Sequence, residues 1–375
     1  MRRVLSVGLA VLMAVGVAAA IFVSVTGGGK DAGGDLTEVR GVIGSEKQPF
    51  FRDPAVVKAF AAHGLKVAVD TAGSRDIASS TDLSKYDFAF PAGAQAAPPI
   101  KRKLKATREY GPFQTPMAIA TFTEIAEVLQ KAGVAKPIDG AKRQYWRFDV
   151  KAYLDLVKRD TRWIDVPGNK AYPARKSVLV SSTDVRTSNS AALYLAIASY
   201  VANGENVVAG SAKAVKIARE VAPLFVRQGY TEASTEGPFE DYLAIGAGKT
   251  PMVMVYESQF LARRASGDGS IRPGMVLMYP GPDVVTRHTL IPRTAAGDRV
   301  GRLLTEDPEL QRLAARNGYR PRSQGALEKY LTSKRVPVPP ALVDVVEPPT
   351  YATLETMIET ITTQIDAPVP KEQDR

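Results

Sequence analysis

Polar side chains that could bind a ligand gather where a predicted strand gives way to a predicted helix. The clearest case is the run Thr187-Ser188-Asn189-Ser190, which follows a strand expected over 177–181 and opens a helix expected over 191–201. Such a loop lies at the carboxyl end of a strand, where α/β sheets bind ligands. Free backbone N–H groups at a helix start can hold an anion or a polar group. An ordinary N-cap formed by Thr187 or Ser188, without any ligand, explains the run equally well.

Two further loops follow the first two predicted strands in the same way. Ser45 and Glu46 come after a strand expected over 39–43, and Ser74 and Arg75 come after one expected over 65–69. An arginine there is a plausible partner for an anion, although it could equally be a plain surface residue. One such loop is weak evidence for a binding site, and three in one chain are more suggestive.

A fourth candidate loop is Tyr256-Glu257-Ser258, which follows a buried strand expected over 251–256. An aromatic ring and a carboxylate there could contact a ligand. The alternative is a carboxylate placed at a helix N-terminus, where the helix dipole favours it. The residues predicted to bind the ligand are therefore Ser45, Glu46, Ser74, Arg75, Thr187, Ser188, Asn189 and Tyr256.

The composition argues against most enzyme chemistries. The 375 residues include no cysteine and only two histidines, His63 and His288. A thiolate metal site, a cysteine nucleophile and a site with several histidine ligands are therefore impossible. Ser181 and Ser182 lack the G-x-S-x-G elbow of a hydrolase, and the loop at 44–47 lacks the spacing of a phosphate loop. We expect no enzymatic activity, no metal and no cofactor.

The net charge of +10 raises the question of a polyanionic partner. Basic residues are scattered along the chain, and Lys101 to Lys105 is their only tight cluster. No interleaving of aromatic and basic residues resembles a nucleic-acid-binding face. We therefore expect a dispersed basic surface and no nucleic-acid partner.

The N-terminus predicts a membrane anchor. No residue from Val4 to Val25 is charged, and Arg2 and Arg3 precede this stretch. As a helix it would be about 33 Å long at about 1.5 Å per residue, enough to cross the bilayer core. The arginines would stay in the cytoplasm and the bulk of the chain would lie outside the cell membrane. A cleaved signal peptide is the alternative, but the apolar run is long for one.

The remaining pattern predicts an α/β fold. Strands and helices alternate from the start, which implies parallel pairing of the first strands. Asp53 is a good N-cap with Pro54 at the first helical position, and Asp307 and Pro308 repeat the arrangement. Further helices are expected over 212–228 and 351–365.

The order of segments resembles the bacterial extracellular solute-binding proteins with the type II periplasmic fold. Three pieces carry the resemblance: the run 183–190, the run 251–258 followed by 276–280, and the stretch 297–321, which ends in Gly-Tyr-Arg-Pro. The likeness covers most of residues 36–365. Members in Gram-positive bacteria are usually tethered by a lipidated cysteine, which this chain lacks.

The resemblance implies two α/β lobes joined by crossover strands near 114–121 and 275–279, with the ligand enclosed between them. The implied parts are a transmembrane helix at 1–25, a linker at 26–35, lobe one at 36–113 and 275–365, lobe two at 114–274, and a charged tail at 366–375. Loops 44–47 and 73–75 would face loops 187–190 and 256–258 across the cleft.

The leading functional hypothesis is an extracytoplasmic protein that captures a small polar or anionic solute, with membrane transporter subunits as candidate partners. The alternative is an envelope stress or scaffold protein that keeps the fold without capturing a solute. A serine hydrolase is disfavoured by the missing motifs.

Overall fold

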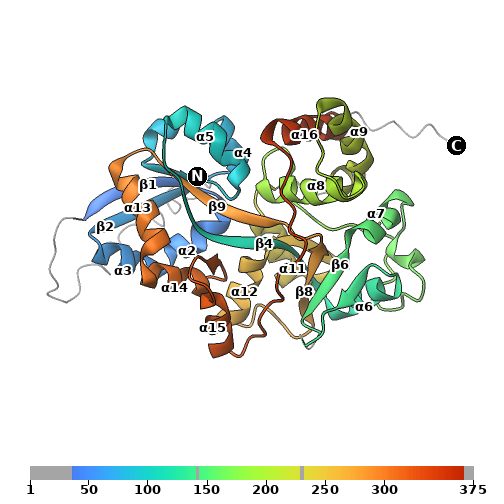
Figure 1. Ribbon diagram of the computed structural model, residues 1–375. Coiled ribbons are helices and arrows are strands. Elements are labelled where there is room, and N and C mark those ends of the chain that lie inside the picture. The colour runs from blue at the N-terminus through green and yellow to red at the C-terminus, as the bar shows by residue number, and fades with distance from the viewer. Residues whose placement is uncertain (1–35, 141–142, 229–231, 367–375) are drawn as a thin grey trace, which may run out of the picture. The chain divides into compact units, whose positions relative to one another are not determined.

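The computed structural model of the chain describes residues 36–140, 143–228 and 232–366 (Figure 1). The predicted membrane helix at 1–25, the linker at 26–35 and almost all of the predicted tail at 366–375 lie outside these residues. Within the described ranges, no helix combines the length and the apolar character needed to cross a membrane.

The first strands pair in parallel, which confirms the pairing expected from their spacing. Strand β1 (Thr37–Ile43) lies between β2 (Leu65–Thr71) and β3 (Phe88–Phe90). Strand β3 then pairs in antiparallel fashion with β9 (Val285–Pro292), which comes from much later in the chain. The α/β class is therefore confirmed, with a sheet that mixes parallel and antiparallel pairs.

The long strand β4 (Tyr110–Phe122) joins two parts of the sheet. Its first half pairs with β9, and its second half pairs with both β7 (Met252–Tyr256) and β8 (Met275–Gly281). Strand β8 also pairs with β6 (Tyr145–Asp149). The sheet is completed by the short strands β5 (Ala135–Pro137) and β10 (Arg320–Pro321).

Most helices surround these strands, and several begin as the sequence predicts. Asp53 accepts a hydrogen bond from the Ala55 N–H at the start of α3, and Asp307 does the same for the Leu310 N–H at the start of α14. Their ranges are α2 (Gln48–Arg52), α3 (Pro54–Ala62), α4 (Ser74–Ser79), α5 (Ala97–Leu104), α6 (Thr123–Lys131), α7 (Val150–Lys158), α8 (Asn189–Ala202), α9 (Ser211–Val221), α10 (Pro223–Val226), α11 (Glu236–Ala244), α12 (Glu257–Ser266), α13 (Ala295–Glu306), α14 (Pro308–Arg316), α15 (Ala326–Ser333) and α16 (Tyr351–Ile365). Single 3-10 turns occur at Ser45–Lys47 (η1), Leu83–Lys85, Ala94–Ala96, Trp163–Asp165 and Gly246–Gly248.

Two predicted elements differ from the structure. The strand expected over 177–181 is wrong, because this segment forms only single bridges from Ser177 to Arg162 and from Ser181 to Val253. The helix expected over 212–228 is divided into α9 and α10 at Pro223. Proline has no N–H to donate and therefore starts the second helix more easily than it continues the first.

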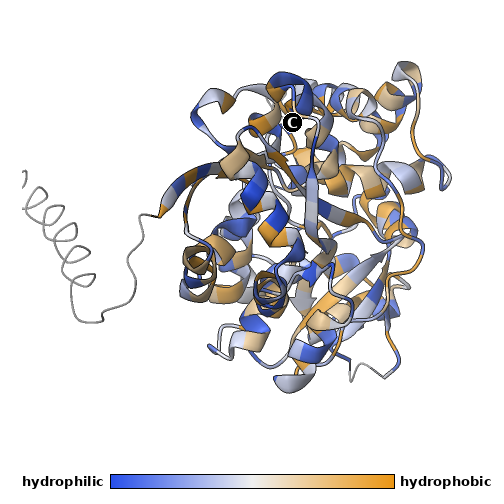
Figure 2. Ribbon diagram, turned by 60° about the vertical axis from the view of Figure 1, so that its left-hand side comes forward, coloured by the Kyte–Doolittle hydropathy of each residue, from blue (hydrophilic) through white to orange (hydrophobic). Residues whose placement is uncertain are grey.

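Apolar side chains pack into separate clusters on the two parts of the sheet. One cluster joins β1, β3 and β9 to α2, α3, α13 and α14, with Phe50, Phe60 and Phe88 among its members. The largest joins β4, β6, β7 and β8 to α6, α7, α8 and α9 around Trp146 and Trp163. Figure 2 shows hydrophobic and hydrophilic residues on the same helices, as expected of helices that bury one face.

Helix α16 packs differently from the predicted lobe boundaries. Its apolar face, formed by Leu354, Met357, Ile358 and Ile361, belongs to the same cluster as α8 and α9. Figure 1 shows α16 beside α9. The resemblance predicts residues 275–365 in lobe one, but α16 and the strand β8 both pack with residues from the segment 114–274. The division of the rest of the chain into two lobes stays a prediction.

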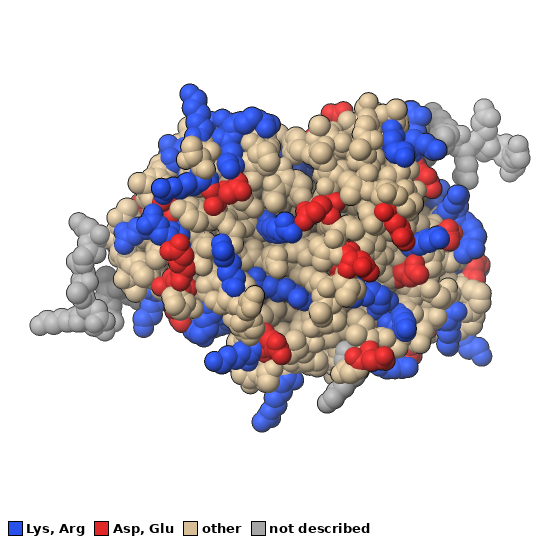
Figure 3. All heavy atoms as spheres, viewed as in Figure 1, with Lys and Arg blue, Asp and Glu red and all other residues tan. Residues whose placement is uncertain are grey.

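Charged residues are mixed on the face drawn in Figure 3, where Lys and Arg lie among Asp and Glu over most of the surface. This face agrees with a dispersed distribution of the basic residues.

Candidate functional site

The predicted loops meet around one small cavity. Six of the eight predicted residues line it: Ser45, Glu46, Ser74, Ser188, Asn189 and Tyr256. The other lining residues are Gly44, Ala72, Gly73, Ser190, Ala233, Ser234 and Thr235. The space open to the centre of a water molecule is about 10 Å³, which is room for about one water. The side chains around the cavity therefore fill most of it.

Strand-to-helix transitions position these groups. The turn η1 follows β1, α4 follows β2, and α12 follows β7. Helix α8 begins at the cavity, with Ser188 in the N-cap position. Because the first N–H groups of a helix have no partner within it, the start of α8 offers hydrogen-bond donors to this space.

Ser188 is not an ordinary side-chain cap. Its hydroxyl makes no capping bond to α8 and instead lies 2.9 Å from the Ser190 hydroxyl, which lies 2.7 Å from that of Thr183. Capping by the Thr187 hydroxyl is likewise not observed, since this group is buried without a hydrogen-bond partner among the described residues. Thr187 does not line the cavity.

Contacts across the cavity join segments that are far apart in the sequence. The Ser45 hydroxyl donates to the Ser234 hydroxyl at 2.9 Å, and the Asn189 amide donates to the Tyr256 hydroxyl at 3.3 Å. Gly73 lies so close to the opposite loop that an added Cβ would be 2.7 Å from the backbone oxygen of Thr187. Glycine is therefore required at this close approach.

Ser74 and Arg75, two more of the predicted residues, also have partners within the protein. The Ser74 hydroxyl accepts a hydrogen bond from the Ala92 N–H at 2.8 Å. Arg75 does not line the cavity: its Nε donates to the backbone oxygen of Arg186 at 2.8 Å, and its two terminal nitrogens donate to the carboxylate of Glu355. The guanidinium of Arg75 is thus engaged by the protein rather than directed at the cavity.

Sequence reasoning missed a buried charge beside the site. Lys47 is fully buried and pairs with Glu46, and its Nζ lies 3.3 Å from Nδ1 of His288. Burial lowers the pKa of Lys47, and the Glu46 carboxylate opposes this shift. Burial and the nearby Lys47 charge hold the pKa of His288 well below its usual value, so the ring is neutral. Lys47 stands in a predicted site loop, but nothing in the local sequence shows that its ammonium group is enclosed.

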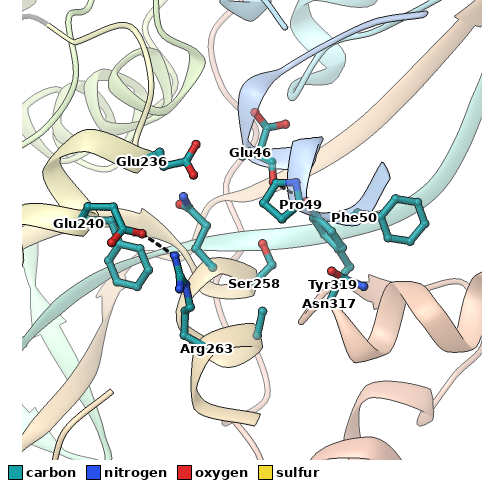
Figure 4. A pocket seen from close by; sticks show the side chains of 12 residues that line it. Glu46, Pro49, Phe50, Glu236, Glu240, Ser258, Arg263, Asn317 and Tyr319 are labelled. Carbon is teal, nitrogen blue, oxygen red and sulfur yellow. Dashed lines mark hydrogen bonds and ion pairs between the residues drawn. The ribbon is translucent and has the colours of Figure 1, made fainter. Parts of the chain in front are cut away.

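A second cavity lies on the other side of Glu46 (Figure 4). About 80 Å³ of it is open to the centre of a water molecule. Figure 4 shows Glu236 and Ser258 around this space, together with the ion pair between Glu240 and Arg263. The Tyr319 hydroxyl donates to the backbone oxygen of Glu46 at 3.0 Å, which fixes the loop between the two cavities.

Glu257, the carboxylate considered in the fourth loop, is buried in an ion pair. Its oxygen lies 2.8 Å from the Arg320 guanidinium, and its side chain is fully enclosed. Burial raises the pKa of Glu257, and Arg320 opposes this shift.

Among residues 36–140, 143–228 and 232–366, no group of three or more acidic or histidine side chains is placed to hold a metal ion.

No protein-family profile and no curated protein sequence matches the chain. Its structure does match solved structures of binding proteins. The sulfate-binding protein SubI from Mycobacterium tuberculosis H37Rv has a TM-score of 0.53 at 15% identity, over 88% of this chain and 99% of that one. A periplasmic thiamin binding protein has a TM-score of 0.54 at 12% identity, over 91% and 100%.

A solute binding protein of an ABC transporter from Thermotoga lettingae TMO, solved with α-D-tagatose, has a TM-score of 0.53 at 12% identity, over 90% of this chain and 96% of that one. These identities are low, so the likeness is one of fold. The predicted resemblance to bacterial solute-binding proteins with the type II periplasmic fold is confirmed at that level.

Proposed function

We propose that this chain is an extracytoplasmic solute-binding protein that captures a small polar or anionic solute in the cavity of Ser45, Ser74, Ser188, Asn189 and Tyr256. The observation that carries the proposal is the convergence of these groups from four separate loops on the start of α8. Serine hydroxyls and an asparagine amide can both donate and accept hydrogen bonds. The fold shared with solute-binding proteins supports the same function.

The polarity of the site favours a polar solute over an apolar one. Each hydrogen bond contributes only about 0.5–1.5 kcal/mol net, so useful affinity requires several of them together. The start of α8 adds donors that favour negative charge. The structural neighbours are named for sulfate, thiamin and a sugar, so their diversity does not select one solute for this chain.

Solute entry requires a second conformation. The cavity holds about one water, so the loops at 44–46 and 73–74 must move away from those at 188–190 and 233–235 to admit a larger solute. A solute that contacts both sides then favours the closed state. Anchoring by residues 1–25, and delivery to membrane transporter subunits, are further parts of this proposal.

The alternative function, a scaffold protein that has kept the fold without capturing a solute, is favoured by one observation. Several polar groups around the cavity already bond to one another, including Ser45 to Ser234 and Asn189 to Tyr256. A cavity whose polar groups already bond to one another can be a structural contact between loops and bind no solute.

A thermal-shift panel separates the two functions. The purified chain would be heated with sulfate, phosphate, thiamin, tagatose, amino acids and sugars at rising concentrations. A solute-binding protein should show a Tm that climbs with the concentration of one compound, by mass action. A flat response across the panel supports the scaffold function instead.

A further inference from the structure

An ion pair links two helices that are anchored in different parts of the fold. Helix α4 carries Arg75 and packs beside α5, in an apolar cluster that includes Val42 of β1 and Ile291 of β9. Helix α16 carries Glu355 and packs against α9 and α8 in the largest cluster. The contact between Arg75 and Glu355 therefore bridges two separate apolar clusters.

The geometry of this contact is that of a strong pair. Both terminal nitrogens of Arg75 reach the carboxylate of Glu355, one of them at 2.6 Å. The two side chains are 16% and 24% exposed. Bidentate arginine–carboxylate pairs are geometrically specific, and salt screens partly buried pairs less than exposed ones. The same guanidinium also holds the backbone oxygen of Arg186, two residues before the N-cap of α8.

Helix α16 is itself held firmly on the side of α8 and α9. The chain that leads to it is tied to Asp283, which accepts from the Val343 N–H at 2.8 Å and from the Val346 N–H at 3.0 Å. At its other end, Asp366 lies 3.3 Å from the Arg186 guanidinium. Glu355 is therefore held on the side of α8 and α9 by the apolar face of α16 and by the contact of Asp366 with Arg186.

The pair also lies directly beside the cavity. Ser74, which lines the cavity, is the residue before Arg75, and Arg186 directly precedes the predicted site loop at 187–190. Breaking the pair would remove one of the contacts that hold the 73–75 loop beside the loop that starts α8, and the bond from Arg75 Nε to the Arg186 backbone oxygen would remain. These two loops approach most closely at Gly73 and Thr187.

We infer that the pair of Arg75 and Glu355 is a latch that holds the cavity closed when no solute is bound and so regulates access to it. The inference rests on the proposed function only in calling the cavity a solute site. The latch opposes solute entry, because the pair must break before the loops can separate. It equally slows the escape of a captured solute.

The absence of cysteine from the sequence allows a direct test in the full chain. Cysteines introduced at the exposed positions Lys58 in α3 and Lys213 in α9 would carry spin labels, and pulsed electron resonance would measure the distance between them. Without any added solute, the otherwise wild-type chain should give a single distance population. Glu355→Gln should add a longer distance population, and Arg75→Gln should add the same one.

Two further variants complete the test. Glu359→Gln makes the same chemical change one turn along α16 at an exposed position, and it should leave the distance unchanged. The swap of Arg75→Glu with Glu355→Arg should restore the distance found in the otherwise wild-type chain. A longer population that appears with Glu355→Gln but not with Arg75→Gln reflects undocking of α16 and would overturn the latch, as would unchanged distances in both. Because this experiment uses no solute, its result does not depend on whether the thermal-shift panel finds a stabilising compound.

Discussion

The buried pair of Lys47 and Glu46 places two opposite charges beside the cavity of the candidate site. Removing one member of such a pair leaves the other charge enclosed without compensation, at a cost of roughly 3–5 kcal/mol. Lys47→Met should therefore lower the free energy of unfolding by about that amount. The double variant Lys47→Met with Glu46→Gln should recover most of the loss. Urea denaturation measures the free energy of unfolding of both variants. Equal losses of this free energy in the single and the double variant would contradict the pairing.

His288 makes a pH-dependent contribution to stability. The pKa of its ring is held below the ordinary value near 6.5 by burial and by Lys47, so the unfolded chain binds a proton more readily than the folded one. Stability is therefore full above about pH 6.5 and is lost as the pH falls, by up to about 1.4 kcal/mol per pH unit.

His288→Phe should flatten this dependence, because phenylalanine carries no titrating group and keeps an aromatic ring among Phe90, Phe113 and Tyr319. Urea midpoints at pH 7.5 and pH 5.5 provide the measurement. If the variant loses as much stability between these two values as the parent chain, the buried ring is not the source of the effect.

Single residues also show what a sequence can predict about a site. The place of Ser188 and Asn189 at the start of α8 is predictable, because a polar run between a strand-like segment and a helix has a local signature. Lys47 and His288 are separated by a long stretch of chain, and only the folded sheet brings them within 3.3 Å. The loop position of Arg75 suggests a ligand-binding residue, yet its partner Glu355 stands far away in sequence.

At the scale of elements, the loop before α4 lies against the loop before α8 at Gly73. A methyl group at Gly73 would meet the backbone oxygen of Thr187, which cannot easily move aside. Gly73→Ala should lower stability by about 1–3 kcal/mol through overpacking and should weaken solute binding. Gly111→Ala in β4 is the matched control, because a Cβ added there would have no neighbouring atom within 4 Å.

Thermal denaturation of the two glycine variants, with and without a stabilising compound, compares them. Gly111→Ala should have nearly the Tm of the parent chain, since substitutions in open space usually change stability by less than about 0.5 kcal/mol. Equal Tm values of the two variants, with and without the compound, would show that the Gly73 contact does not control closure.

The elements themselves are largely predictable where short-range signals exist. The starts of α3 and α14 follow from Asp-Pro pairs, and the parallel pairing of β1 with β2 follows from the spacing of strands and helices. The segment 177–181 reads as a strand because it is apolar and bounded by polar residues, but it forms only bridges. The packing of α16 on α9 depends on long-range contacts, and the pattern within the helix does not choose its partner.

At the scale of the whole molecule, the proposed anchor has its own test. The uncharged stretch from Val4 to Val25 should keep the full chain in the membrane fraction. Deleting residues 1–30 should release a soluble and folded product. Fractionation followed by circular dichroism checks both outcomes, and recovery of a chain cleaved after Ala20 in the medium would contradict an uncleaved anchor.

Capture of a solute in the cavity is the central claim, and Asn189 allows the most direct test. Its amide lines the cavity at the first position of α8. Asn203→Ala, at the opposite end of the same helix, is the matched control. Calorimetric titration would use whichever panel compound raises the Tm. Asn189→Ala should weaken binding roughly tenfold, for the loss of one or two hydrogen bonds, while Asn203→Ala binds like the parent chain. Unchanged affinity in Asn189→Ala, or the absence of any stabilising compound, would contradict solute capture at this site.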